Sequence, residues 1–265
     1  MHRLARAGLA LALLLDRGAA AAAEAPPPAD FTACVERNVP EPDHVRGVRI
    51  TARDRAGAKR IIVLKLQGRR SAEGRRQLLV RFGQPADVAG VSLLVLEQEG
   101  ESEVYLASPE LPEPRKITAN DRSQGIVGTD LSYEDLEWIQ GFRTPRSSKR
   151  LPDDRVGKRE VYVVEATPER SSYARVLAQI DKKSCLPLRL QFFEPGGRLR
   201  KEITADPSFL QQHGEVWVAH AVLIRDMRDG TSTHFMVDTH EQDLLLPEGT
   251  FDVEGLRRSV GGETR

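Results

Sequence analysis

Short runs in which apolar and polar residues alternate are the feature that most constrains how this chain of 265 residues can fold. A period of two residues is typical of a β-strand that has one face on a core and the other in water. In one run Ile62, Leu64 and Leu66 fall on one face, with Lys65 and Gln67 on the other. The runs occupy residues 45–54, 59–69, 76–85, 91–99, 102–109, 158–168, 173–183, 186–206 and 215–243. Because no helix-length apolar period alternates with them, the sequence predicts an antiparallel sheet rather than a parallel α/β sheet.

Turn residues lie between several of these runs. Pro195-Gly196-Gly197 ends one strand-like run, and Arg228-Asp229-Gly230 stands inside the last segment. Residues 99–101, Glu-Gly-Glu, join two further runs. Glycine and proline at such places favour tight turns between neighbouring strands. The sequence therefore predicts one domain of the mainly β (α+β) class, with one long antiparallel sheet that is interrupted once.

The interruption is residues 115–154, where alternation is weak and the end is a polar, proline-bounded loop. It contains VGTDLSYEDLEWIQGF, residues 127–142, in which four carboxylates stand among large apolar side chains. Ser132 and Asp135 have the spacing of a capping box, and acidic residues in a first turn complement the helix dipole. A calcium loop would need oxygens at alternating positions over a longer span. The motif therefore predicts a capped helix from Tyr133, with Glu134 and Glu137 turned outward.

The N-terminus resembles a secretory signal peptide, residues 1–23. Arg3 and Arg6 form a positive region, residues 9–15 form a short apolar core, and small residues follow up to Ala23. The apolar core is far too short to anchor the chain in a membrane. Residues 24–44 then predict a proline-rich linker and a short helix. The sequence predicts an exported, soluble chain.

The two cysteines, Cys34 and Cys185, suit an oxidising compartment. We expect them to form one disulfide, because nothing near either has the spacing of metal ligands. The alternative is two separately buried thiols.

Charge and motifs exclude several classes of function. Lys and Arg together number 39, as do Asp and Glu, so the chain lacks the basic surplus of a nucleic-acid-binding protein. No phosphate-binding, dinucleotide-binding, zinc-protease or serine-hydrolase motif is present. A nucleophile at Ser132 would need a histidine partner, and no motif in the sequence indicates one. The histidines follow no metal-binding pattern: His44, His213, His220, His234 and His240. We expect no enzyme activity, metal or cofactor.

A sheet that is apolar on one face must cover that face. The helical material available is the N-terminal turn, the insertion and the segment FDVEGLRRSV at residues 251–260. From the residues alone two outcomes stay open. The helices fill the concave side completely, or part of it remains a cavity for an apolar ligand.

The central motif carries a resemblance to a known family. GIVGTDLSYEDLEWIQGF, residues 125–142, resembles the G-[ST]-D-[FL]-S-Y-E-D-L signature of the periplasmic outer-membrane lipoprotein-sorting (LolA-like) proteins. The resemblance implies an incomplete antiparallel β-barrel over residues 45–260, with a small helical lid on its concave face. In this lid Leu131, Tyr133 and Leu136 would face the sheet.

The same resemblance implies a function without catalysis. Such proteins bind acyl chains of lipids or lipoproteins and carry them across the periplasm, often beside an export pump of the inner membrane, with transient membrane contact only. The alternative on this fold is an envelope-stress sensor module that binds a membrane-tethered partner. Alternation predicts that the ligand would touch Leu64, Leu66, Leu94, Leu96, Leu188, Leu190 and Phe192. A one-residue error in register would turn any of these to the opposite face.

Overall fold

The computed structural model describes Cys34, Asn38 and residues 43–99, 102–141 and 145–261, with side chains up to Arg257. The predicted signal peptide, residues 1–23, lies outside the described residues. So does most of the predicted linker and short helix in residues 24–44.

Strands dominate the described chain. The first group of strands is β1 (Asp43–Arg53), β2 (Lys59–Arg70), β3 (Arg76–Gln84), β4 (Ser92–Glu97), β5 (Ser102–Ala107) and β6 (Arg115–Lys116). The second group is β7 (Ser147–Val156), β8 (Arg159–Thr167), β9 (Arg175–Asp181), β10 (Pro187–Phe193), β11 (Leu199–Ala205), β12 (Leu210–His213), β13 (Val216–Ala219), β14 (Ala221–Asp226) and β15 (Thr231–Leu244). The helices are α2 (Tyr133–Ile139), the 3₁₀ turn η1 (Pro207–Phe209) and α3 (Val253–Gly261).

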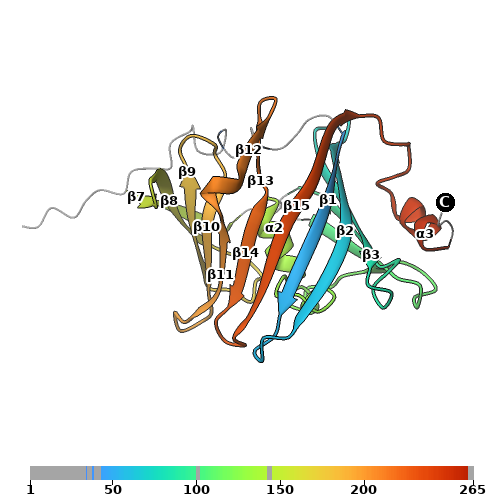
Figure 1. Cartoon of the computed structure of the whole chain (residues 1–265), viewed down its shortest axis with the longest axis horizontal. Helices are drawn as coiled ribbons and strands as arrows, with labels where there is room; N and C mark the ends of the chain where they lie inside the picture. Colours follow the sequence, from blue (N-terminus) through green and yellow to red (C-terminus); the bar gives the residue numbers. More distant parts are fainter. Residues whose placement is uncertain (1–33, 35–37, 39–42, 100–101, 142–144, 262–265) are drawn as a thin grey trace, which may run out of the picture.

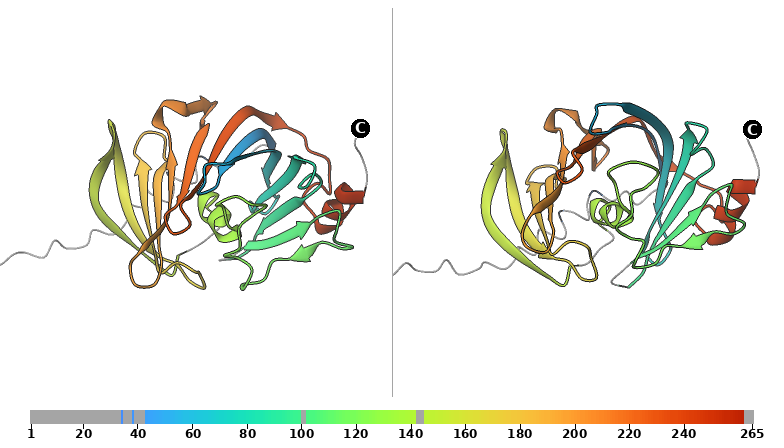
Figure 2. Two further views of the ribbon diagram at one scale, coloured as in Figure 1. Left: turned by 60° about the horizontal axis from the view of Figure 1, so that its bottom comes forward. Right: turned by 90° about the horizontal axis from the view of Figure 1, so that it is seen from below.

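Thirteen of the described strands form one antiparallel sheet in the order β6-β5-β4-β3-β2-β1-β15-β14-β11-β10-β9-β8-β7. The first and last long strands, β1 and β15, pair at its centre, and the hairpin β12–β13 forms a separate small sheet. The large sheet bends into an arch around α2, as Figures 1 and 2 show. Among the described strands β6 and β7 are its two edges, so the arch stays an open half-barrel. The predicted fold class is confirmed.

At the centre of the sheet, the alternation of apolar and polar residues predicted correctly which side chains face the core. Val48 pairs with Leu64 and Ile50 with Ile62, and all four side chains are buried in the main core cluster. Ile61, the neighbour of Ile62 on β2, lies on the other face and is 57% exposed. The β10–β11 turn brings Gly196 and Gly197 to positive φ, a region that costs glycine little.

The prediction of a polar, proline-bounded loop at the end of residues 115–154 is wrong in part. Its last residues form β7, which pairs with β8 and is exposed along most of its length. An edge strand needs no continuous apolar face, and it tolerates a proline where pairing is irregular. The β7–β8 register shifts between Leu151 and Asp154, where Pro152 stands.

The helix α3 covers the outer, convex face of the sheet rather than its concave face (Figure 2). Leu256 of α3 and the preceding Phe251 join a buried cluster with Leu79 and Leu94 from β3 and β4. Both faces of β4 are therefore apolar, a situation that alternation alone cannot resolve.

The helix α2 lies inside the arch on the concave face (Figure 2). Leu131, Tyr133 and Leu136 are buried in the main core cluster, together with residues of β1–β5, β9–β11 and β14. The structure thus places all three of the predicted lid residues against the sheet.

Candidate functional site

A cavity of about 920 Å³ lies between the concave face of the sheet and α2. This volume is at the upper end of the range for small-molecule sites in proteins. The floor is apolar and comes from both halves of the sheet, with Val48, Ile50, Val80 and Phe82 on one side and Ala178, Ile203, Val222 and Ile224 on the other. Leu136, Trp138 and Ile139 of α2 form part of the opposite wall.

Three of the seven residues predicted to touch a ligand line this cavity. Leu64 and Leu66 do so from β2, and Leu190 does so from β10. These strands lie on opposite sides of the β1–β15 pair, so the curvature of the sheet brings the two predicted groups to one space. A role of these residues in ligand contact remains a prediction.

Leu94 and Leu96 point away from the cavity, and the predicted orientation of both is corrected here. Leu94 is fully buried beneath α3, and Leu96 packs against the same outer cluster. The cavity side of β4 carries Leu93 and Val95 instead. The cause is the apolar outer face under α3, which makes β4 a run of buried residues without a polar side.

Leu188 and Phe192 do not line the cavity either. Leu188 belongs to a separate cluster with Val161 and Val163, at a register irregularity between Pro187 and Arg189. Phe192 is fully buried in the main core, and its ring centroid lies 4.8 Å from that of Tyr173. Phe192 belongs to the same main core cluster as Leu190, and Leu188 belongs to a separate one.

The loop before α2 is a tight structure that the central motif specifies. Gly125 and Ser132 form a β-bridge, and the amide of Ile126 donates to the carbonyl of Leu131 at 2.7 Å. Gly128 has φ +77°, a conformation in which a side chain would be strained. The loop aims the motif's carboxylates at the sheet.

The predicted capping box is confirmed. The Ser132 hydroxyl accepts from the amide of Asp135 at 3.2 Å, and the Asp135 carboxylate accepts from the amide of Ser132 at 2.8 Å. Two amides at the start of the helix are thereby satisfied, which stabilises α2 despite its length of seven residues.

The predicted outward orientation of Glu134 and Glu137 is wrong, because both are buried and paired. Glu137 receives Arg122 Nη1 at 2.6 and 2.8 Å, together with the Ser102 hydroxyl. Glu134 receives the hydroxyls of Ser171 and Ser172 from the loop before β9. Buried carboxylates are retained where such donors satisfy them.

Two further carboxylates of the motif hold α2 to the centre of the sheet. Lys201 of β11 donates from Nζ to Asp135 Oδ2 at 2.6 Å and to the backbone carbonyl of Asp130 at 2.7 Å. The Tyr173 hydroxyl donates to Asp135 at 2.7 Å, and burial next to this carboxylate raises the pKa of Tyr173. The Asp130 carboxylate accepts from Thr233 of β15 at 2.7 Å.

The other end of α2 is also fixed. Arg76 of β3 donates to the backbone carbonyls of Gln140 at 3.1 Å and Gly141 at 2.7 Å, and it pairs with Glu97 of β4. With contacts to both halves of the sheet, α2 is a fixed wall of the cavity. The acidic cluster of the motif is structural, and no local pattern predicts its distant partners Lys201 and Arg122.

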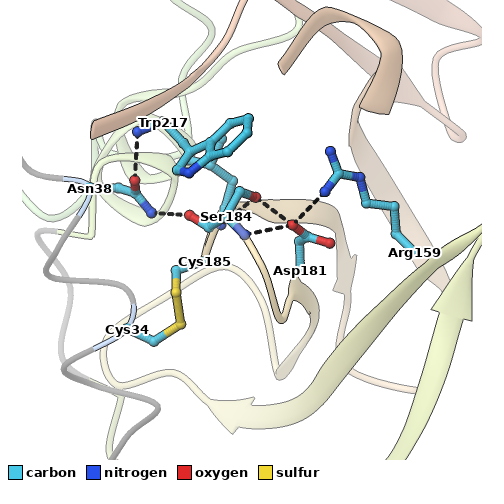
Figure 3. The surroundings of a disulfide bond; sticks show 8 residues. Cys34, Asn38, Arg159, Asp181, Ser184, Cys185 and Trp217 are labelled. Atoms are coloured by element: carbon cyan, nitrogen blue, oxygen red, sulfur yellow. Dashed lines mark hydrogen bonds and ion pairs between the residues drawn. A yellow bond between two sulfur atoms is a disulfide. The ribbon is translucent and has the colours of Figure 1, made fainter. Parts of the chain in front are cut away.

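The predicted disulfide is confirmed. Cys34 and Cys185 are bonded across 151 positions of the chain, with Cα atoms 5.3 Å apart. Figure 3 shows the bond beside the β9–β10 turn. The Asn38 side chain donates to the Ser184 carbonyl and accepts from the amide of Trp217 at 2.8 Å. Asn38, Cys185 and Trp217 line one end of the cavity, so the N-terminal segment is tied to its rim.

Two properties of the described residues bear on function. They contain no helix that combines the length and the apolar character needed to cross a membrane. They also contain no group of three or more histidine, cysteine or acidic side chains arranged to hold a metal ion.

Comparisons with known proteins agree with this architecture. A protein-family model, described as that of an uncharacterized protein, matches residues 74–258. An outer membrane lipoprotein-sorting protein domain from Vibrio parahaemolyticus is similar, with a TM-score of 0.76 and 22% identity over 86% of this chain and 97% of that one. A DUF1329 family protein from Desulfovibrio piger is similar with a TM-score of 0.78 and 20% identity over 86% and 96%.

A LolA superfamily protein from Nitrosomonas europaea is also similar, with a TM-score of 0.65 and 15% identity over 85% of this chain and 98% of that one. None of the curated proteins matches the chain. At these identities the solved structures establish a shared fold.

Proposed function

We propose that this chain, which belongs to the family whose model matches residues 74–258 and shares its fold with outer membrane lipoprotein-sorting and LolA superfamily proteins, is a periplasmic, non-enzymatic carrier of lipids or of the acyl chains of lipoproteins. The observation that carries the proposal is the cavity of about 920 Å³ with its apolar walls. An exported chain with a signal peptide at residues 1–23 would meet such ligands between the two membranes of the envelope.

Apolar burial supplies the binding energy of such a carrier. Removing apolar surface from water contributes about 25 cal/mol per Å², or roughly 0.8 kcal/mol for each methylene group. A cavity lined by Leu64, Leu66 and Leu190 offers this gain without any covalent chemistry. A carrier of this kind would exchange its ligand with membranes through transient contact, and an inner-membrane export pump is the partner we propose for loading.

The fixed position of α2 bears on how a ligand would enter. Hydrogen bonds and an ion pair join α2 and the residues on either side of it to β3, β11 and β15, so movement of α2 would break several of these contacts together. We therefore propose entry at the end of the cavity where β1 begins and the β12–β13 hairpin stands, rather than by lifting a helical lid.

The test is retention of lipid by the exported protein after purification in the absence of detergent. Extraction and mass spectrometry should find about one acyl-chain ligand per protein. Leu66→Asp places a charge in the cavity wall and should lower lipid retention about tenfold or more, because an unpaired charge is unfavourable in an apolar site. Ile61→Asp, on the exposed face of the same strand, is the matched control and should retain lipid.

Equal retention by Leu66→Asp and the unchanged protein would contradict the proposal, as would the absence of lipid from both. Stable binding of a membrane-tethered protein domain that lipid displaces would instead favour the sensor alternative on the same fold.

A further inference from the structure

Four of the chain's six histidines meet at one end of the concave face, although they are far apart in sequence. The ring centroids of His213 and His240 are 4.3 Å apart, and those of His213 and His220 are 5.4 Å apart. His44 lies 6.3 Å from His240 by the same measure. Their elements are β1, the β12–β13 hairpin with the residue that follows it, and β15. We call these residues and Arg46 the histidine–arginine cluster.

Arg46 connects this cluster to the cavity. His44 and Arg46 both line the cavity wall, on the same face of β1 as Val48 and Ile50. Along β1 the cavity wall therefore changes from apolar at Val48 to basic at Arg46, the next residue on the same face of the strand. Gly68 lies opposite His44, and a Cβ there would come within 2.4 Å of its ring, so a glycine is needed to make room for the imidazole.

Among the described residues, no carboxylate pairs with the guanidinium of Arg46. Its Nε donates to His240 Nδ1 at 3.1 Å, and its two Nη nitrogens donate to no described residue. Within the described chain no Asp or Glu forms an ion pair with Arg46, His213, His220 or His240, although the sequence holds 39 acidic residues. Most other arginines lining the sheet are paired, for example Arg76 with Glu97 and Arg49 with Asp238.

For neutral rings, the hydrogen bonds assign the nitrogen that carries the proton in His213, His220 and His240. His220 Nδ1 donates to the Val237 carbonyl at 2.9 Å, so its Nε2 accepts from His213 Nε2 at 3.1 Å. His240 Nδ1 accepts from Arg46, which leaves its Nε2 to donate toward Gln242. Burial and the neighbouring Arg46 lower the pKa of His240 to about 4.

Arg46 therefore carries the positive charge of the cluster at neutral pH. Burial lowers the pKa of Arg46 to about 10, which still leaves it protonated. A half-buried guanidinium with two unoccupied nitrogens is suited to a planar, two-point contact with a phosphate or carboxylate. An anion placed there would lie directly above the apolar floor formed by Val48 and Ile50.

We propose that the histidine–arginine cluster binds the anionic phosphate of a lipid headgroup, so that the carrier prefers an anionic phospholipid whose chains occupy the cavity. This inference rests on the proposed lipid-carrier function and adds the ligand class to it. Arg46 would hold the phosphate through its Nη nitrogens, and its Nε–H bond to His240 would keep the guanidinium in place. The cluster stands at the end of the cavity next to the exposed β12–β13 hairpin, where a headgroup can remain near water.

The experiment measures the affinity of the purified, delipidated protein for two probe lipids at pH 7. The lipids are phosphatidylglycerol and diacylglycerol with identical acyl chains. We expect phosphatidylglycerol to bind about tenfold more tightly or better, the scale of one charge-assisted contact. Arg46→Gln should lower the affinity for phosphatidylglycerol toward that for diacylglycerol and so remove this preference, whereas Arg46→Lys should keep part of it. Arg49→Gln, an arginine on the opposite face of the same strand, is the matched control and should change neither affinity.

Inorganic phosphate alone, titrated by calorimetry, separates a headgroup from a free anion. We expect it to bind at least about tenfold more weakly than phosphatidylglycerol, because it lacks the apolar contribution of the chains. Three results would each overturn the inference: equal affinity for both lipids, an unchanged preference in a folded Arg46→Gln protein, or phosphate binding as tight as lipid binding. If diacylglycerol still binds in these cases, the proposed carrier function stands. Failure of both lipids to bind would overturn the carrier function as well.

Discussion

Replacing Lys201 by methionine tests whether the buried contacts of α2 hold the cavity wall in place. Lys201 has a side-chain exposure of 7%, and its partner Asp135 has 0%. The substitution keeps the apolar stem of the side chain but removes the ammonium group, which is bonded to Asp135 at 2.6 Å and to the Asp130 carbonyl at 2.7 Å. The Asp135 carboxylate would keep only the Ser132 amide and the Tyr173 hydroxyl as donors.

Breaking one side of a buried ion pair typically costs about 3–5 kcal/mol, because the remaining charge stays buried without compensation. For a domain of this size such a loss corresponds to a fall in Tm of roughly 6–20 °C. Denaturant unfolding followed by circular dichroism measures the change directly. The exposed Lys65 of β2 is the matched control, and Lys65→Met should change the free energy of unfolding by no more than about 0.5 kcal/mol.

A second substitution separates the charge from the loss of packing. Lys201→Met combined with Asp135→Asn removes the uncompensated carboxylate while an amide oxygen can still accept from Ser132. The double variant should therefore be more stable than Lys201→Met alone. A loss of less than about 1 kcal/mol in Lys201→Met, or no recovery in the double variant, would show that the buried ion pair does not hold α2 in place.

Two further predictions concern the rim of the cavity. Cys34→Ser with Cys185→Ser opens a covalent loop spanning 151 positions, and chain entropy predicts a loss of up to about 5 kcal/mol. Unfolding of the oxidised protein and of the double variant measures this loss, and equal stability would argue against it. The pKa of His240 is lowered to about 4 from its usual 6.5, so the unfolded chain takes up a proton first as the pH falls. The lipid-free protein should therefore lose stability between pH 6.5 and 4. His240→Asn should reduce this loss, and the same pH dependence in that variant would contradict the assignment.

The architecture could be predicted from the sequence where one face of a strand is wet. On β2 the buried Ile62 and Leu64 alternate with the exposed Ile61 and Lys65, so the period alone identified the cavity side. On β4 it failed, since α3 buries the outer face and four consecutive residues are hidden. No local pattern on β4 could have revealed that a helix more than 150 residues later covers it.

The motif around α2 was predictable in its local part and unpredictable in its distant part. The capping box of Ser132 and Asp135 depends on residues three positions apart, which the sequence states directly. The burial of Glu134 and Glu137 depends on Arg122 and on the serines before β9, and these meet the helix only when the sheet bends around it. The histidine–arginine cluster was missed for the same reason, since it is assembled from three separate regions of the chain.

A carrier of the proposed kind holds an acyl chain between the concave face and α2, and photo-crosslinking with a lipid that carries a diazirine in its acyl chain locates that chain. After irradiation, peptide mass spectrometry maps the residues that the chain touched. If the acyl chain lies in the cavity, we expect crosslinks to cavity-lining residues such as Leu64, Leu66 and Leu190. We expect none to Leu94 or Leu96 beneath α3. Crosslinks concentrated on the outer face, or a pattern that Leu66→Asp leaves unchanged, would contradict it.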